Sequence, residues 1–450
     1  MPSVDSLLLD PTVISLVEEF SREAVVGLTR EFLEGLRKGI IDGADPPPFA
    51  EVVQGIYGEA IIAWQNDPRT VINATGVILH TNLGRAPLSS EATDAILQCS
   101  RGYSNLEYDL GLGGRGKRTG QLERLLIQLT GAEAAFVVNN NASAILLALA
   151  TLAKGQEVIV SRGELVEIGG GFRIPDVLNE SLADMVEVGT TNRTYIDDFD
   201  DAITERTSSI LKIHSSNFQV VGFAHSPSLR EMVELGREKG VLVLHDLGSG
   251  SLIDTGRFDL HSEPMPQTSI SAGVDLVCFS GDKLLGGPQS GIILGKKAIV
   301  DRLKVHPLAR ALRIGKFGIA GLSATLLHYL KGEALSRVPV WNMISTGVDV
   351  LYERAGEVAR KIGDGCRVVE GVSAIGGGSL PGDTLPTWLV AMDGDCFGGG
   401  GVVGFFDRLR RGKPPVIGRI ENDRLLLDPR TVYPWDPDVL VRTVNCALGK

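Results

Sequence analysis

Apolar side chains recur at three- and four-residue spacing along the first part of the chain. The pattern runs from Ile14 to Ile40 and predicts an amphipathic helix. Three prolines at 46–48 end it, and a second helical pattern follows from Phe49 to Trp64. We therefore expect a helical N-terminal domain over residues 1–66.

Short apolar strands then alternate with helical patterns. Strands separated by helices are typical of a mostly parallel sheet with both faces covered, so residues 67–325 are predicted to form a large α/β domain. Ligands of such sheets lie beyond the carboxyl ends of the strands. The residues that directly follow the strands are therefore the candidates for chemistry. The predicted strands are 134–138, 157–160, 185–188, 208–213, 241–246, 275–279 and 291–294.

The final part of the chain changes again. A long helical pattern runs from Leu322 to Ile362, and a glycine-rich region follows it. Within that region VVEGVSAIGGG, LPTWLVAM and RLLLDPRTV resemble strands, whereas GGVVGFFDRLRRG resembles a helix. Residues 326–450 are thus predicted to form a smaller α+β domain.

Composition excludes several classes of protein. The 450 residues carry 44 basic and 55 acidic side chains, a net charge of −11, which excludes a general nucleic-acid-binding surface. No apolar run reaches the ~20 residues of a membrane span, and the N-terminus lacks the basic region of a signal peptide. The five cysteines form no CxxC pair. We therefore expect a cytoplasmic protein without disulfides or a zinc site.

The first candidate site follows the strand 134–138. Asn140, Asn141, Ala142 and Ser143 open an apolar helix, where free backbone N–H groups and the positive end of the helix dipole favour a phosphate. The alternative is an ordinary helix cap.

Two further candidates follow later strands. Asp246 ends one strand, and Ser280 and Lys283 follow the next, before a glycine-rich turn. This order is similar to that of pyridoxal-phosphate enzymes with the aspartate-aminotransferase fold (fold type I). There Lys283 would form a Schiff base with the cofactor, Asp246 would keep the pyridine nitrogen protonated, and Ser280 would help hold the phosphate. The alternatives are a turn aspartate and a structural lysine.

The sequence also contains a misleading pattern. Residues 111–116 satisfy G-x-G-x-x-G, but SNLEYDL before them is a poor buried strand and no βαβ unit surrounds them. A dinucleotide site is therefore not predicted. We expect this loop, with Arg115, Lys117 and Arg118, to approach an anionic ligand or a neighbouring subunit.

Long motifs across the chain resemble the bacterial selenocysteine synthase (L-seryl-tRNA(Sec) selenium transferase) family. The resemblance implies conversion of seryl-tRNA(Sec) to selenocysteinyl-tRNA(Sec), with pyridoxal 5'-phosphate as cofactor and selenophosphate as selenium donor. It also implies a reaction in which loss of water gives an aminoacrylyl intermediate, to which selenium then adds. The motifs are INATGVILHTNLGRAPLS (72–89), YDLGLGGRGKR (108–118), VVNNNASA (137–144), HSSNFQVVGF (214–223), HDLGSG (245–250) and SGDKLLGGPQSGIILG (280–295).

The resemblance also implies roles for individual residues. Lys283 would remove the Cα proton, and Arg85, Arg310 and Arg313 would bind the selenium donor, for which a guanidinium fork suits a phosphate-like anion. Surface salt bridges are the alternative for the arginines. His80, His214 and Asn217 lie in the matched motifs, and the last two are expected beside the cofactor. A structural role is the alternative for either histidine.

The family further implies a ring of ten subunits built from dimers, with active sites between protomers and tRNA bound by the N-terminal domain. Residues 1–66 carry four basic and eleven acidic side chains, a charge of −7 that is unfavourable for an RNA backbone. Recognition of RNA shape by a few side chains stays open.

Two other functions are compatible with the same fold. The first is a lyase that eliminates ammonia or water from a small amino acid or an amino sugar phosphate. The second is a non-catalytic RNA-binding or scaffold protein, against which the joint presence of Lys283, Asp246 and Ser280 argues.

Overall fold

The computed structural model describes residues 1–64, 67–169, 171–398 and 400–450, and it divides the chain into the units Met1–Thr70 and Val71–Lys450. The predicted boundary at residue 66 falls outside the described residues. The first unit is a small helical bundle with its own apolar core. It contains α1 (Val4–Leu7), α2 (Pro11–Glu19), α3 (Arg22–Ile41) and α4 (Phe49–Trp64).

The pattern from Ile14 to Ile40 forms two helices and not the single predicted one. Ser21 separates α2 from α3, because its side chain accepts the Ala24 N–H and so caps a new helix. The prolines and Phe49 mark the start of α4 as predicted.

A seven-stranded sheet forms the centre of the second unit. Its order is β5-β13-β12-β11-β10-β6-β9, with every pair parallel except the two that β13 makes. The predicted mostly parallel sheet is confirmed. Its strands are β5 (Ala134–Val138), β6 (Glu157–Ser161), β9 (Asp184–Val188), β10 (Thr207–Ile213), β11 (Leu242–Gly248), β12 (Leu276–Ser280) and β13 (Gly291–Gly295).

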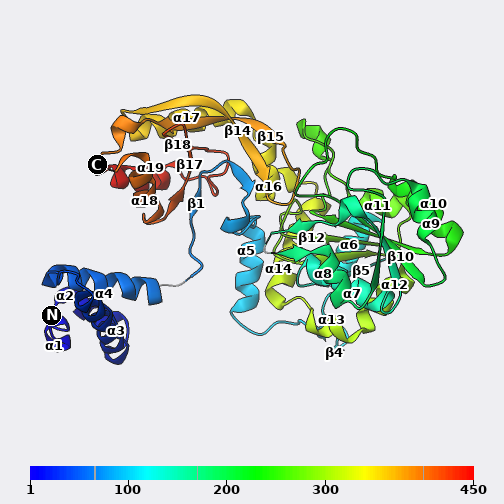
Figure 1. Cartoon of the computed structure of the whole chain (residues 1–450), viewed down its shortest axis with the longest axis horizontal. Helices are drawn as coiled ribbons and strands as arrows, with labels where there is room; N and C mark the ends of the chain where they lie inside the picture. The colour runs from blue at the N-terminus through cyan, green and yellow to red at the C-terminus, as the bar shows by residue number, and fades with distance from the viewer. Residues whose placement is uncertain (65–66, 170, 399) are drawn as a thin grey trace. The chain divides into compact units, whose positions relative to one another are not determined.

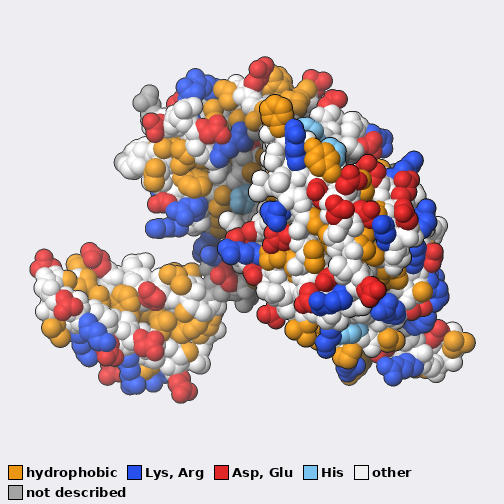
Figure 2. All heavy atoms as spheres, turned by 45° about the vertical axis from the view of Figure 1, so that its right-hand side comes forward, with side chains coloured by type: hydrophobic (Ala, Val, Ile, Leu, Met, Phe, Trp, Pro, Cys, Tyr) orange, Lys and Arg blue, Asp and Glu red, His pale blue; other side chains and the backbone are white. Residues whose placement is uncertain are grey.

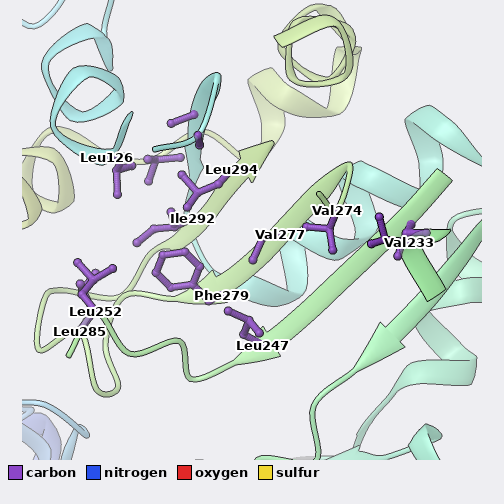
Figure 3. Close-up of a cluster of buried hydrophobic side chains, with 14 of the residues drawn as sticks. Leu126, Val233, Leu247, Leu252, Val274, Val277, Phe279, Leu285, Ile292 and Leu294 are labelled. Carbon is purple, nitrogen blue, oxygen red and sulfur yellow. The ribbon is translucent and has the colours of Figure 1, made fainter. Parts of the chain in front are cut away.

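Helices cover both faces of this sheet (Figure 1). Alternate residues of each strand point to opposite faces, so Val277 and Phe279 enter one core while Leu276 and Cys278 enter the other. Figure 3 shows the first core, in which Phe279 lies among side chains such as Ile292 and Leu247. The helices of this lobe are α5 (Ser90–Ser100), α6 (Gly120–Thr130), α7 (Asn141–Leu152), α8 (Ile174–Glu180), α9 (Ile196–Ala202), α10 (Leu229–Lys239), α11 (Pro266–Ala272), α12 (Lys297–Val305) and α13 (Pro307–Ala311).

A second sheet of five strands, ordered β17-β18-β15-β14-β2, forms the C-terminal lobe. Residues 72–79 take part in this lobe, because β2 pairs with β14 and β1 pairs with β16. Helices α17 to α19 contribute to its core. The elements are β1 (Ile72–Asn73), β2 (Val77–Leu79), β14 (Cys366–Gly376), β15 (Thr384–Met392), β16 (Val416–Ile417), β17 (Arg419–Glu421), β18 (Arg424–Leu427), α17 (Val348–Ile362), α18 (Gly401–Arg410) and α19 (Pro437–Leu448).

The long helical pattern from Leu322 to Ile362 is broken into four helices, which corrects the prediction. They are α14 (Lys316–Leu330), α15 (Ala334–Arg337), α16 (Pro339–Ser345) and α17. Gly332 has a φ of +71°, and Pro339 begins α16, so both positions interrupt a continuous helix.

The remaining strands form two short hairpins, β3 (Tyr108–Asp109) with β4 (Gly114–Arg115) and β7 (Glu167–Ile168) with β8 (Phe172–Arg173). Residues 111–116 therefore lie in a hairpin and not in a βαβ unit, as expected. Acidic and basic side chains are interspersed on the face seen in Figure 2. Among the described residues, the helices all lack the combination of length and apolar character that crossing a membrane requires.

Candidate active site

Lys283 lies in the turn after β12 and is 4% exposed. Gly378, from the loop after β14, packs directly against it. A Cβ added to Gly378 would lie 2.7 Å from Lys283 Nζ, and the glycine has a φ of +79°. The C-terminal lobe therefore provides one wall around the lysine, and a larger residue at position 378 would have to displace the end of the lysine side chain and adopt a left-handed backbone conformation.

The environment of Lys283 favours its neutral amine. Burial lowers the pKa of Lys283, and the positive charge of Arg85 lowers it further, against the opposite effect of Asp246 and Asp282. A neutral lysine is a nucleophile, whereas an ammonium is not. The side chain is thus prepared for Schiff-base chemistry.

Asp246 lies at the carboxyl end of β11 and is buried. Its Oδ1 accepts hydrogen bonds from Asn141 Nδ2 at 2.8 Å and from the Gly248 N–H at 3.0 Å. Burial raises the pKa of Asp246, while these two donors and the charge of Lys283 lower it. A buried carboxylate of this kind requires a positively charged partner.

The N-terminus of α7 lies beside Asp246. Asn140 caps this helix, because its Oδ1 accepts the Ser143 N–H at 2.8 Å. The N–H groups of Asn141 and Ala142 have no acceptor within the helix. Asn140, Ala142 and Ser143 also line a groove of about 370 Å³ that contains Arg173. Their role as phosphate ligands stays a prediction.

Ser280 is the last residue of β12, pairs with Gly291 of β13 and is buried. It begins the turn that carries Lys283. The structure thus places Ser280, Lys283, Asp246 and the start of α7 at one end of the sheet, as the strand pairing requires.

His214 follows β10 and reaches the same region. Its main-chain N–H donates to the Asp246 carbonyl oxygen at 2.8 Å, and its ring Nε2 lies 3.4 Å from Glu263 Oε2. Glu263 is buried and accepts a hydrogen bond from the Ser249 hydroxyl. The His214 ring therefore lies close to a buried carboxylate without a hydrogen bond between them.

Arg85 forms an ion pair next to the lysine. Its Nη1 lies 2.8 Å from Asp282 Oδ2, and the arginine has a φ of +62°. His80 begins the same segment, and burial lowers the pKa of its ring. The segment 80–85 is thus held against the turn of Lys283.

Three predicted residues have other neighbours in this structure. Arg310 and Arg313 line a groove of about 480 Å³ together with Arg115 and Arg118, and Lys283 is not among its lining residues. Glu107 lies in this groove, 3.8 Å from Arg313 Nη1. Asn217 is exposed, and its Nδ2 donates to the Glu167 carbonyl at 2.9 Å.

The residues around Lys283 fit pyridoxal phosphate. Asn141 Oδ1 and His214 Nε2 are buried without a hydrogen-bond partner in the described part of the chain, and so is Ser379 Oγ beside Gly378. Buried polar atoms without a partner are costly unless a ligand satisfies them. Lys283 could bind the aldehyde, Asp246 could bind the pyridine nitrogen, and the N-terminus of α7 could bind the phosphate.

Sequence reasoning missed three residues of this site. Asp282 directly precedes Lys283, so the motif SGDK was a signal for it. Glu263 and Gly378 come from a loop and from the distant C-terminal lobe, and no local pattern marks either of them.

Comparison with known proteins agrees with this geometry. The family model described as L-seryl-tRNA selenium transferase matches residues 71–433, and a model described as Selenocysteine synthase N terminal matches residues 2–37. An L-seryl-tRNA(Sec) selenium transferase of Carboxydothermus hydrogenoformans is 44% identical over 99% of this chain and 96% of its own. One of Geobacter sulfurreducens is 46% identical, covering 99% and 98%.

Among solved structures, that of D-glucosaminate-6-phosphate ammonia-lyase superposes with a TM-score of 0.60 at 20% identity, over 86% of this chain and 98% of the other. This likeness concerns the fold and confirms the predicted fold type I class. The full-length matches decide the rest: the chain belongs to the L-seryl-tRNA selenium transferase family.

Proposed function

We propose that this protein converts L-seryl-tRNA(Sec) to L-selenocysteinyl-tRNA(Sec), with pyridoxal 5'-phosphate as cofactor and selenophosphate as selenium donor. The observation that carries the proposal is the buried Lys283 beside buried Asp246, in a chain whose relatives named for this reaction match along nearly its whole length.

The chemistry divides between cofactor and protein. When bound, pyridoxal phosphate supplies an aldehyde that condenses with amines and a ring that takes up negative charge. Lys283 would hold the cofactor through its Nζ, and the same Nζ as a neutral amine would take the Cα proton of the seryl group. Asp246, oriented by Asn141 and Gly248, would keep the ring nitrogen of the cofactor protonated. Arg85, beside the lysine, supplies positive charge for the selenium donor.

The sharpest test uses purified holoenzyme with labelled seryl-tRNA(Sec) and selenophosphate, followed by analysis of the esterified amino acid. Wild type should form selenocysteine, and Lys283→Ala should form none. Unchanged serine, together with a keto product from free small substrates, would instead identify a small-molecule lyase.

We also propose that active sites form between subunits of a homo-oligomer, a ring of ten by family resemblance. Arg310 and Arg313 lie in a groove apart from Lys283, and the hairpin of β3 and β4 exposes Leu110 and Leu112. Both observations support completion of a site by a second copy.

Mixed oligomers test this arrangement. Lys283→Ala and Arg313→Ala subunits, each inactive alone, should recover part of the activity when they are unfolded and reassembled together. Mixtures that stay inactive would place the lysine and the arginine in one subunit's site.

Two further proposals concern the whole protein. We propose that the helical unit Met1–Thr70 contacts the tRNA, although its charge requires recognition of shape, and that the reaction occurs in the cytoplasm, which the five free cysteines support. A deletion of residues 2–64 should raise the KM for seryl-tRNA without changing cofactor absorbance. An unchanged KM would contradict the first proposal.

A further inference from the structure

A cavity of about 750 Å³ shares the residue His214 with the candidate active site. It lies among residues that follow β6, β9 and β10, and Thr191 and His214 are among its lining residues. The volume is within the range of about 300–1,000 Å³ that is typical of pockets for cofactor-sized ligands. Because His214 also donates its N–H to the Asp246 carbonyl, the cavity and the lysine site share a residue.

The loop that covers Lys283 also reaches this cavity. Gly378 packs on the lysine, and three residues later the Pro381 carbonyl accepts a hydrogen bond from Gln219 Nε2 at 2.6 Å. His261 pairs with Asp383 on the same loop. Gln219 and His261 both line the cavity. The loop that covers Lys283 is thus bonded to two residues of the cavity wall, and a ligand bound in the cavity would lie next to this loop.

Two flat rings, those of Phe218 and His225, line the cavity. The ring of His225 stacks on Tyr195, with centroids 4.4 Å apart and an interplanar angle of 23°. His225 Nδ1 is bonded to the Thr194 carbonyl, whereas its Nε2 has no partner among the described residues. Phe218 lines the same cavity and is 37% exposed. Exposed rings of this kind are the surfaces on which unpaired nucleobases stack.

A cation lies next to these rings. The Arg193 guanidinium lies 5.6 Å from the centroid of the Phe223 ring, and its Nε donates to the Phe223 carbonyl. Within the described ranges, Arg193 makes no ion pair, whereas Lys212 in the same cavity is paired with buried Glu164 at 3.1 Å. Arg193 is thus the cation that remains available to a phosphate.

We propose that this cavity binds the 3'-terminal nucleotide of the aminoacyl-RNA substrate, with the base against Phe218 and His225 and a phosphate at Arg193. The inference rests on the proposed function, because it states where the RNA end of the seryl substrate lies. Serine is esterified to the terminal ribose, so a nucleotide held beside His214 brings the seryl group toward Lys283.

The test measures binding and not turnover. The probe is the 3'-seryl amide of 3'-amino-3'-deoxyadenosine 5'-phosphate, titrated calorimetrically into the holoenzyme. Phe218→Ala and Arg193→Gln should each raise its Kd about tenfold or more, the usual loss for a stacked base or a charged contact. Phe218→Tyr should restore binding, and Tyr352→Ala, which removes an exposed ring on α17, should leave the Kd unchanged.

A substrate change provides the matching experiment. Replacing the terminal adenosine of seryl-tRNA by cytidine should raise the KM of wild type, because a pyrimidine stacks less well, and should have little further effect in Phe218→Ala. Additive effects of the two changes would overturn the inference.

The outcomes separate this inference from the proposed function. Binding of the probe that depends on Phe218, without selenocysteine formation by wild type, would support the cavity and contradict the function. Selenocysteine formation with equal probe affinity in all variants would overturn the cavity proposal. Loss of oligomer in Phe218→Ala without loss of probe affinity would also overturn it, since the ring would then belong to a contact between copies.

Discussion

Asn141 Nδ2 donates to Asp246 Oδ1 at 2.8 Å, so the first residue of α7 is bonded directly to the carboxylate at the end of β11. The helix that we expect to bind the phosphate and the acid that we expect to bind the ring are thus fixed to each other. A change in their separation would break this hydrogen bond.

This hydrogen bond predicts a pH effect. Asn141→Leu removes a donor that lowers the pKa of Asp246, so that pKa should rise further. Because the ionised carboxylate is then lost at a higher pH, the acidic limb of kcat/KM should move to higher pH. Asp246→Asn should abolish activity at every pH. A pH profile of Asn141→Leu that coincides with wild type would contradict the role of the bond.

Arg85 should control the ionisation of Lys283. Arg85→Gln removes a charge that lowers the pKa of Lys283, so cofactor attachment to the apoenzyme, followed by absorbance, should require higher pH. The variant also leaves Asp282 without its partner and should lose about 1–3 kcal/mol of unfolding free energy. Arg85→Lys keeps the charge and should keep the wild-type midpoint, which makes it the control.

Gly378→Ala should displace the side chain of Lys283 and so hinder its attachment to the cofactor. The added Cβ would lie 2.7 Å from Lys283 Nζ, and we expect at least a hundredfold loss of activity with weakened cofactor attachment. Gly382→Ala is a matched control, because Gly382 has a similar φ of +82° but a Cβ there would meet no atom closer than 4.0 Å. Equal losses in both variants would indicate backbone strain alone.

Glu263 should act through His214. Glu263→Gln keeps the shape of the side chain but removes the charge 3.4 Å from His214 Nε2, and kcat should fall about tenfold with the cofactor spectrum unchanged. In a His214→Gln background the same substitution should have little effect, because coupled residues are not additive. Full additivity in this double-mutant cycle would show that Glu263 is a structural residue only.

Buried His245 should make the protein sensitive to acid. Burial lowers its pKa to about 3, so between pH 3 and 6.5 the unfolded chain binds a proton that the native chain does not. Stability therefore falls as the pH drops below 6.5, by about 2 kcal/mol from this group at pH 5. His245→Gln should show a smaller difference between urea midpoints at pH 7.5 and pH 5, and an unchanged difference would contradict the assignment.

The sequence predicted the central sheet well because its strands are apolar, rich in β-branched residues and bounded by turns. Residues 134–138 coincide with β5. Asp246 and Lys283 were candidates because the first ends a predicted strand and the second follows one. Helix ends were predicted less well. The break at Ser21 depends on one side-chain hydrogen bond, and the break at Gly332 on one backbone torsion angle.

The parts of the site that the sequence did not predict depend on contacts between segments that are distant along the chain. Gly378 lies 95 positions after Lys283, and nothing in its neighbourhood along the chain shows that it packs on the lysine. Motif resemblance placed Arg313 near the selenium donor, but a single copy of the chain places it beside Glu107.

The pairing of β2 with β14 has a consequence for synthesis on the ribosome. Residues 77–79 leave the exit tunnel early, but their partner strand begins at Cys366, and the Gly76 N–H donates to Thr431 Oγ1 at 3.0 Å. The whole central sheet is therefore translated before this early segment finds its place. Until then it is an unpaired strand edge, which is a site for misassembly in a nascent chain.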